Sequence, residues 1–155
     1  LLIIFKANLG IYSRIVVNFP IHLMNQFMQK QIKAVKEFHT AFRIGHSESP
    51  VADLGETKKQ LRYNLMKEEN EEYLEAVLNN DLVEIADALG DMLYILCGTI
   101  IEHGLQHKIE EVFDEIQRSN MSKLGEDGNP IYREDGKVMK GPNYFRPDFS
   151  KILGE

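Results

Sequence analysis

The sequence predicts an all-α protein, an antiparallel four-helix bundle followed by a short C-terminal hairpin. Four long segments carry apolar residues at helical spacing, and stretches rich in Gly, Pro, Ser or Asn separate them. The chain has 155 residues and 43% of them are hydrophobic, which suffices for one domain with a core. We expect an N-terminal extension (1–23), a helical domain (24–124), and a hairpin and tail (125–155) that belong to the same domain.

The N-terminal extension differs from the rest of the chain in its pattern. Its apolar start, Leu1 to Phe5, is soon interrupted by charged and polar residues, so it makes a poor signal peptide. Helical patterning begins only afterwards, and we expect residues 1–23 to be non-native, with natural translation starting at Met24 or Met28. The alternative is an edge strand over residues 11–19.

The first two helices are expected over residues 24–43 and 56–78. In the first, Ile32, Val35 and Phe38 recur at helical spacing. A loop containing Gly, Ser and Pro separates it from the second. The third helix is expected over 82–103, with Asp81 as its N-cap, and the fourth over 107–122.

The end of the chain changes character after the fourth helix. Residues 131–133 and 137–139 flank Glu134-Asp135-Gly136, a pattern typical of a β-hairpin with an Asp-Gly turn. Gly141-Pro142 and Pro147 then argue against a continuation of the helical pattern.

Charge and hydropathy exclude several classes of partner. The net charge of −6 gives no basic footprint for a nucleic acid polymer. No apolar run approaches the ~18 residues of a membrane span. The single cysteine, Cys97, lies in an apolar run, which predicts a buried inert thiol and fits a reducing cytoplasm.

Acidic residues on the second and third helices are the most informative feature. On a helical wheel, Glu69 and Glu72 fall on the apolar face of the second helix, and Glu68 lies at its edge. The third helix is apolar almost all round. Its exception is one narrow stripe, made of Glu84, Asp87 and Asp91.

Several buried carboxylates are too costly to keep together unless a cation neutralises them. An all-oxygen set of ligands favours Mg²⁺, with Mn²⁺ as a substitute. A di-iron bundle would need Glu-x-x-His pairs, which the sequence lacks. The alternative is that the acids form salt bridges. Arg62 and Lys67 are the nearest bases, and two bases do not balance five inward acids.

The two acidic motifs, in this order on consecutive helices, resemble the all-α NTP pyrophosphohydrolase superfamily. This superfamily includes MazG proteins, dimeric dUTPases and phosphoribosyl-ATP pyrophosphohydrolases. The motifs read Glu68-Glu69-Asn70-Glu71-Glu72 and Glu84-Ile85-Ala86-Asp87. The strings at residues 84–94, 118–123 and 135–142 are similar to the MazG-like and phosphoribosyl-ATP pyrophosphohydrolase-like branch. Two registers stay open, because either Glu84 with Asp87, or Asp91 before Met92-Leu93-Tyr94, matches the family's metal ligands.

The resemblance implies a MazG-like helical bundle that hydrolyses an NTP or dNTP to a monophosphate and pyrophosphate in nucleotide-pool clean-up. We expect Mg²⁺ on the inward acids, and Glu68 or Glu69 acting on the attacking water. The candidates for holding the phosphates are Arg118, Asn120, Lys123, Lys137 and Lys140, with the tail as a lid. Weaker candidates for reading the base are Phe38, His39 and Phe42.

Three other interpretations remain open. The substrate is phosphoribosyl-ATP of histidine biosynthesis, or the chain is a non-catalytic module that binds nucleotide or a partner helix, or it is a plain oligomeric bundle. An all-round apolar helix in a single-domain bundle favours subunit association. We therefore expect a homodimer or a homotetramer, with sites near the subunit contacts.

Overall fold

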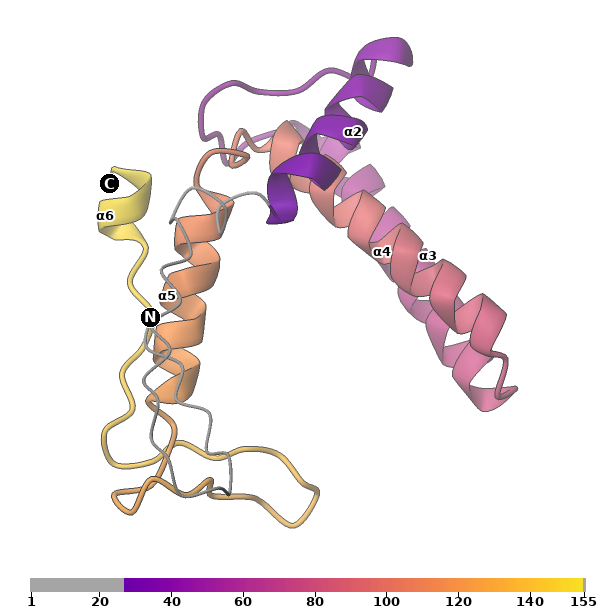
Figure 1. The fold of residues 1–155 in the computed structure, drawn as a ribbon. Coiled ribbons are helices and arrows are strands. Elements are labelled where there is room, and N and C mark those ends of the chain that lie inside the picture. Colours follow the sequence, from indigo (N-terminus) through magenta and orange to yellow (C-terminus); the bar gives the residue numbers. More distant parts are fainter. Residues whose placement is uncertain (1–26, 155) are drawn as a thin grey trace, which may run out of the picture.

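The computed structural model describes residues 27–154, and their regular structure is helical. The helices are α2 (Phe27–Ala41), α3 (Glu56–Leu78), α4 (Leu82–Glu102), α5 (Ile109–Met121) and the single-turn α6 (Ser150–Leu153). Figure 1 shows their arrangement. Where the expected ranges fall on described residues, they agree with the four long helices to within two residues. The all-α class is confirmed. The N-terminal extension and its alternative strand lie outside the described residues.

Helices α3 and α4 form a long antiparallel hairpin (Figure 1). The turn between them is tight because Asn80 adopts a positive φ of 54°. Asp81 then caps α4 as predicted, since its carboxylate accepts hydrogen bonds from the backbone N–H of Val83 (3.0 Å) and Glu84 (3.2 Å). This turn sets how the acidic segments of α3 and α4 face one another.

The hydrophobic core lies where α2 packs against the C-terminal half of α4. Its buried members are Ile32, Val35, Cys97, Ile100 and Ile101. The predicted burial of Cys97 is confirmed, and burial raises the pKa of its thiol. Ile109 at the start of α5 packs against this cluster, and beyond that residue α5 runs apart from α3 and α4 (Figure 1).

The C-terminal tail lies along α5 and is tied to it at several points. The Ser119 hydroxyl donates to the carbonyl of Phe145 (2.8 Å), and the Phe145 N–H donates to the Ser122 hydroxyl (3.2 Å). Farther on, the N–H of Asp148 donates to the Glu115 carboxylate (2.9 Å). Helix α5 and the tail therefore form a separate arm that stands apart from α3 and α4 (Figure 1). The described residues do not close a four-helix bundle.

The expected hairpin is reduced to one isolated antiparallel bridge, between Tyr132 and Val138. The Asp-Gly turn is present, with Gly136 at a φ of 82°. No strand forms within residues 27–154. No helix forms over residues 122–149, and the single-turn α6 begins only after Pro147, where Asp148 Oδ1 accepts the Ser150 N–H (3.0 Å).

Much of the apolar surface of the long hairpin is exposed. Leu78, Leu82 and Val83 at its tip are 72%, 77% and 74% exposed. Further exposed apolar residues on α3 and α4 are Leu61, Met66, Leu74, Leu89, Leu93 and Leu96. None of the described helices has the length and apolar character needed to cross a membrane.

Candidate active site

Glu69 is the point at which the acidic residues of α3 and α4 converge. Its side chain is half-buried, and the Oε2 atom is enclosed without a hydrogen-bond partner. Burial raises the pKa of Glu69, and the negative charges of Glu72, Asp91, Glu68 and Asp87 raise it further, in that order. Two predicted clusters, far apart in sequence, thus form one field of negative charge.

The antiparallel hairpin produces this convergence. On α3, Glu72 lies one turn after Glu69; on α4, Asp87 and Asp91 lie one turn apart on the same face. Glu84 lies nearer the turn, where with Glu72 it lines a surface hollow whose other residues are Glu75, Ala76, Asn79 and Asp81. Glu84 is not among the groups that raise the pKa of Glu69.

The carboxylates do not form a closed cluster in this conformation. Within residues 27–154, no three His, Cys, Asp or Glu side chains lie close enough together to hold a metal ion. Like charges oppose such convergence when no cation is bound. Glu72, Asp87 and Asp91 are exposed and free to change rotamer around the unpartnered Glu69 oxygen. The oxygen-only donor set fits a hard divalent cation such as Mg²⁺.

The two bases that could have neutralised these acids are engaged elsewhere. The Arg62 guanidinium points toward α4, where it donates to the carbonyl of Ile95 (2.8 Å). Lys67 pairs with Glu71 (3.4 Å) on its own helix. This observation counts against salt bridges as the explanation of the acidic cluster, because its excess negative charge remains.

The predicted phosphate-binding residues lie on the separate arm. Arg118 makes two hydrogen bonds of 2.8 Å to Glu115, and its guanidinium lies 4.2 Å from the ring centre of Phe145. Lys123 donates to the side-chain oxygen of Asn120 (2.7 Å). Figure 1 shows α5 running apart from α3 and α4, so one chain does not bring these groups to the acids.

The tail lysines behave differently from one another. The ammonium group of Lys140 lies 4.3 Å from the ring centre of Tyr144, within the tail itself. Lys137 is exposed beside the Asp-Gly turn. The tail in this conformation follows α5, and it does not lie over the acids of α3 and α4 (Figure 1).

An aromatic cluster adjoins the acids along α4. Phe38 and Phe42 have ring centres 4.3 Å apart, and Phe38 meets Tyr94 edge-on at 5.6 Å. Tyr94 follows Asp91 by three residues, so both share one side of α4. From the sequence, Tyr94 is named only in the run Met92-Leu93-Tyr94 after Asp91 and is not grouped with Phe38 and Phe42; its spacing from Asp87 and Asp91 was the signal.

His39 has a structural environment. It is 2% exposed, and its Nδ1–H donates to the carbonyl of Gly45 (2.9 Å). The imidazole therefore holds the start of the loop after α2. Of the three residues predicted to read a base, Phe38 and Phe42 present surface to solvent.

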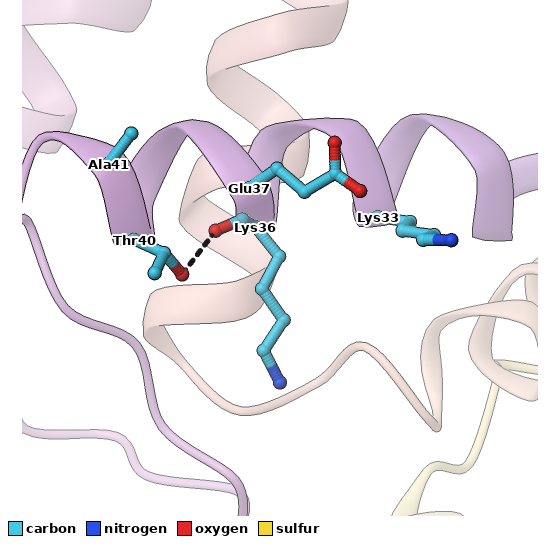
Figure 2. A pocket seen from close by; sticks show the side chains of 5 residues that line it. All are labelled: Lys33, Lys36, Glu37, Thr40 and Ala41. Atoms are coloured by element: carbon cyan, nitrogen blue, oxygen red, sulfur yellow. Dashed lines mark hydrogen bonds between the residues drawn. The ribbon is translucent and has the colours of Figure 1, made fainter.

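A second hollow lies on the outer side of α2 (Figure 2). It is lined by Lys33, Lys36, Glu37, Thr40 and Ala41. Thr40 donates back to the carbonyl of Lys36 (2.8 Å), and Lys36 pairs with Glu48 (2.8 Å). A single helix forms this hollow, and it contains none of the acids around Glu69.

Comparison with known proteins assigns the family. The family model described as phosphoribosyl-ATP pyrophosphohydrolase matches residues 35–120, which is more than half of the chain. The chain belongs to the phosphoribosyl-ATP pyrophosphohydrolase family. The matched range contains the aromatic cluster, all the acids discussed above, Arg118 and Asn120. Membership in this family confirms the resemblance drawn from the motifs, and the family is described as one of pyrophosphohydrolases.

The chain is also similar to one curated protein and to one solved structure. An uncharacterized protein of Acanthamoeba polyphaga mimivirus is 39% identical over 83 residues, which make up 49% of this chain. The chain spans 32% of that relative's length. A solved structure of a candidate NTP pyrophosphohydrolase from Exiguobacterium sp. 255-15 is 26% identical, with a TM-score of 0.42. That match covers 80% of this chain and 92% of the other.

Proposed function

We propose that this family member is a Mg²⁺-dependent nucleoside triphosphate pyrophosphohydrolase. It cleaves an NTP or dNTP between the α- and β-phosphates, releasing a nucleoside monophosphate and pyrophosphate, and serves in nucleotide-pool clean-up. The observation that carries this proposal is Glu69, a half-buried carboxylate that has an unpartnered oxygen and lies close enough to four further acids for their charges to raise its pKa.

The metal ligands in this proposal are Glu69, Glu72, Asp87 and Asp91, because these acids share one field. Glu84, which lies toward the turn, is the outer candidate. The chemistry that a bound Mg²⁺ supplies is neutralisation of charge at the phosphates and a lower pKa for a coordinated water. Mn²⁺ has similar ligand preferences and is expected to substitute.

Glu68 is the proposed general base. It is exposed, neighbours Glu69 in sequence, and contributes to the charge around it. A water oxygen attacks the α-phosphorus while the Glu68 carboxylate accepts the water's proton. The bond from the α-phosphorus to the bridging oxygen breaks, and that oxygen leaves with the pyrophosphate.

The proposed base subsite is formed by Phe38, Phe42 and Tyr94. Aromatic rings stack on any nucleobase, whatever its identity, which suits an enzyme that acts on several nucleotides. Because Tyr94 and Asp91 share one side of α4, a nucleotide whose base lies on the rings directs its phosphates toward the acids.

A second copy of the chain completes the site in this proposal. The acids lie on α3 and α4, whereas Arg118, Asn120 and Lys123 lie on the separate arm. The long hairpin exposes many large apolar side chains, and a surface of this kind is typical of a site of protein association. Association into a homodimer or homotetramer would cover them, close a MazG-like four-helix bundle, and bring basic residues of one copy to the acids of another.

Phosphoribosyl-ATP is the second candidate substrate, favoured by the description of the matching family. Its triphosphate would break at the same bond, so the acids serve both reactions. A module that binds nucleotide without turnover is the non-catalytic alternative.

A pyrophosphate-release assay across the common NTPs, dNTPs and phosphoribosyl-ATP tests the proposal. We expect turnover that EDTA abolishes and that added Mg²⁺ or Mn²⁺ restores. Asp87→Asn should lower kcat/KM by about 100-fold or more, as loss of a metal ligand does. Glu71→Gln is the matched control, because Glu71 is on the same hairpin but pairs with Lys67. Nucleotide binding without hydrolysis of any substrate would instead establish the binding module.

A further inference from the structure

We propose that Arg62 is a positioning residue: it fixes the register of α3 on α4, and so sets the spacing of the carboxylates around Glu69. This inference rests on the proposed metal site. It concerns a residue that touches neither metal nor substrate and that sequence reasoning had treated only as a counter-charge.

The Arg62 side chain joins α3 to α4 through several contacts. It is 8% exposed, donates from Nη2 to the Ile95 carbonyl (2.8 Å), and donates from Nε to the Thr99 hydroxyl (3.1 Å). Its Nη1 lies 3.9 Å from the buried Glu102 carboxylate. A planar guanidinium that satisfies two fixed acceptors in a buried site tolerates little sliding of one helix along the other.

Gly98 provides the space for this contact. A Cβ atom at this position would lie 2.7 Å from Nη2 of Arg62 and 3.1 Å from Nε2 of His39. His39 comes from α2 and is itself held by the Gly45 carbonyl. Side chains from two helices thus meet over a residue of α4 that has no side chain, and this junction locates α3 on α4.

The register set at Arg62 continues to the acids. On α3, Glu69 lies seven residues after Arg62. On the antiparallel α4, Asp87 lies eight residues before Ile95, and Asp91 lies eight residues before Thr99. At ~1.5 Å per residue, these intervals measure about 10.5 and 12 Å, so both contacts belong to one register. A slip by one residue would turn the acid side chains by about 100° and separate them.

The test is direct Mn²⁺ binding to the full chain without nucleotide, measured by the electron paramagnetic resonance signal of free Mn²⁺. Arg62→Met removes the hydrogen bonds from this side chain to α4. Gly98→Ala keeps the arginine in the sequence but displaces its guanidinium from α4. Each should weaken Mn²⁺ binding about 10-fold, as outer-shell changes commonly do. Arg62→Lys keeps one donor and should fall between Arg62→Met and the unaltered protein.

Two comparisons separate positioning from general stability. Gly90→Ala is the matched control, because a Cβ at Gly90 meets no atom within 4 Å on the same helix; its Mn²⁺ affinity should stay unchanged. The double variant Arg62→Met/Gly98→Ala should bind as weakly as either single variant, since both act through the same contact. Circular dichroism confirms that each variant is folded at the binding temperature.

Folded Arg62→Met or Gly98→Ala that binds Mn²⁺ as tightly as the unaltered chain would overturn the inference and leave the proposed function standing, even if the melting temperature falls. If Arg62→Met does not fold, the Gly98→Ala and Arg62→Lys results decide. An unaltered chain that binds no Mn²⁺ would overturn the proposed metal site, and the positioning role with it.

Discussion

Glu69 occupies a place where a negative charge is unfavourable. Burial and four neighbouring acids raise its pKa, so the folded chain holds a proton on this group more tightly than the unfolded chain does. The folded state therefore loses stability as the pH rises through the raised pKa of Glu69. A cation bound there would return this stability, since it favours the ionised form.

Glu69→Gln should accordingly raise the melting temperature at neutral pH when divalent ions are absent, by about 2 °C. The gain should fade as the pH falls below the ordinary carboxyl range, where Glu69 is protonated in both states. Added Mg²⁺ should stabilise the unaltered chain but not the variant. Differential scanning calorimetry over pH measures this, with Glu71→Gln as control. Equal melting temperatures for Glu69→Gln and the unaltered chain at every pH would contradict it.

At the residue scale, the helical wheel predicted that Glu69, Asp87 and Asp91 face inward. In one chain only Glu69 is partly buried, whereas Asp87 and Asp91 are exposed, because the wheel gives the direction of a residue and not what covers it. Spacing could not identify the partner of Arg62. A long side chain reaches in several directions, and its acceptors on α4 are 33 and 37 residues away in sequence. The contact between Tyr94 and Phe38 was not predicted for a related reason, since an aromatic residue within an apolar run ordinarily predicts core.

At the scale of elements, the helix boundaries followed from local chemistry, with Asp81 capping α4 as predicted. The direction of α5 did not, because it depends on the link after α4. There the ring of His103 donates to the carbonyl of Val51 (2.7 Å), and Gly104 adopts a φ of 67°. Such contacts between a loop and a helix end join segments far apart in the chain, and periodicity carries no trace of them.

The attachment of the tail to α5 leads to a second prediction. A Cβ at Gly141 would lie 2.1 Å from the Leu124 carbonyl oxygen, a backbone atom that cannot rotate away. Gly141→Ala should therefore detach the tail and speed limited proteolysis within residues 126–149 by about 10-fold, as for a segment whose local stability falls by about 1.4 kcal/mol. Glu134→Ala, at an exposed position of the same segment, is the control. A cleavage rate equal to that of the control would show that the tail is held otherwise.

At the scale of the whole molecule, the acids around Glu69 lie on the hairpin of α3 and α4, whereas the predicted phosphate-binding residues lie on the arm formed by α5 and the tail. Apolar side chains are exposed at the tip of the hairpin. The apolar pattern of the third helix predicted association, since a helix that is apolar all round needs other segments to cover every side. It could not reveal that the fourth helix stands apart, because single-sequence periodicity says which face is apolar and not which copy covers it.

Leu82→Glu tests association. Leu82 is 77% exposed, so a charge there costs the single chain little, whereas burying that charge between copies costs several kcal/mol. Size-exclusion chromatography with light scattering should show an oligomer for the unaltered chain and a shift toward monomer, with loss of turnover, for the variant. Gln60→Glu adds the same charge at an exposed position of α3 and should not change the mass. A monomeric unaltered chain at micromolar concentration would refute the assembly.

The core cluster and the acids occupy different stretches of α4: Cys97, Ile100 and Ile101 lie toward its end, and Asp91 and Asp87 precede Cys97 by about two and three turns. Apart from the junction of Arg62 and Gly98, which joins the two stretches, substitutions at the acidic end should therefore change stability almost independently of substitutions in the core. A fold divided in this way can acquire a new nucleotide preference through substitutions near Asp91 and Tyr94 with little loss in its free energy of unfolding. Descendants of one ancestral hairpin could thus diverge in substrate without first evolving a sturdier core.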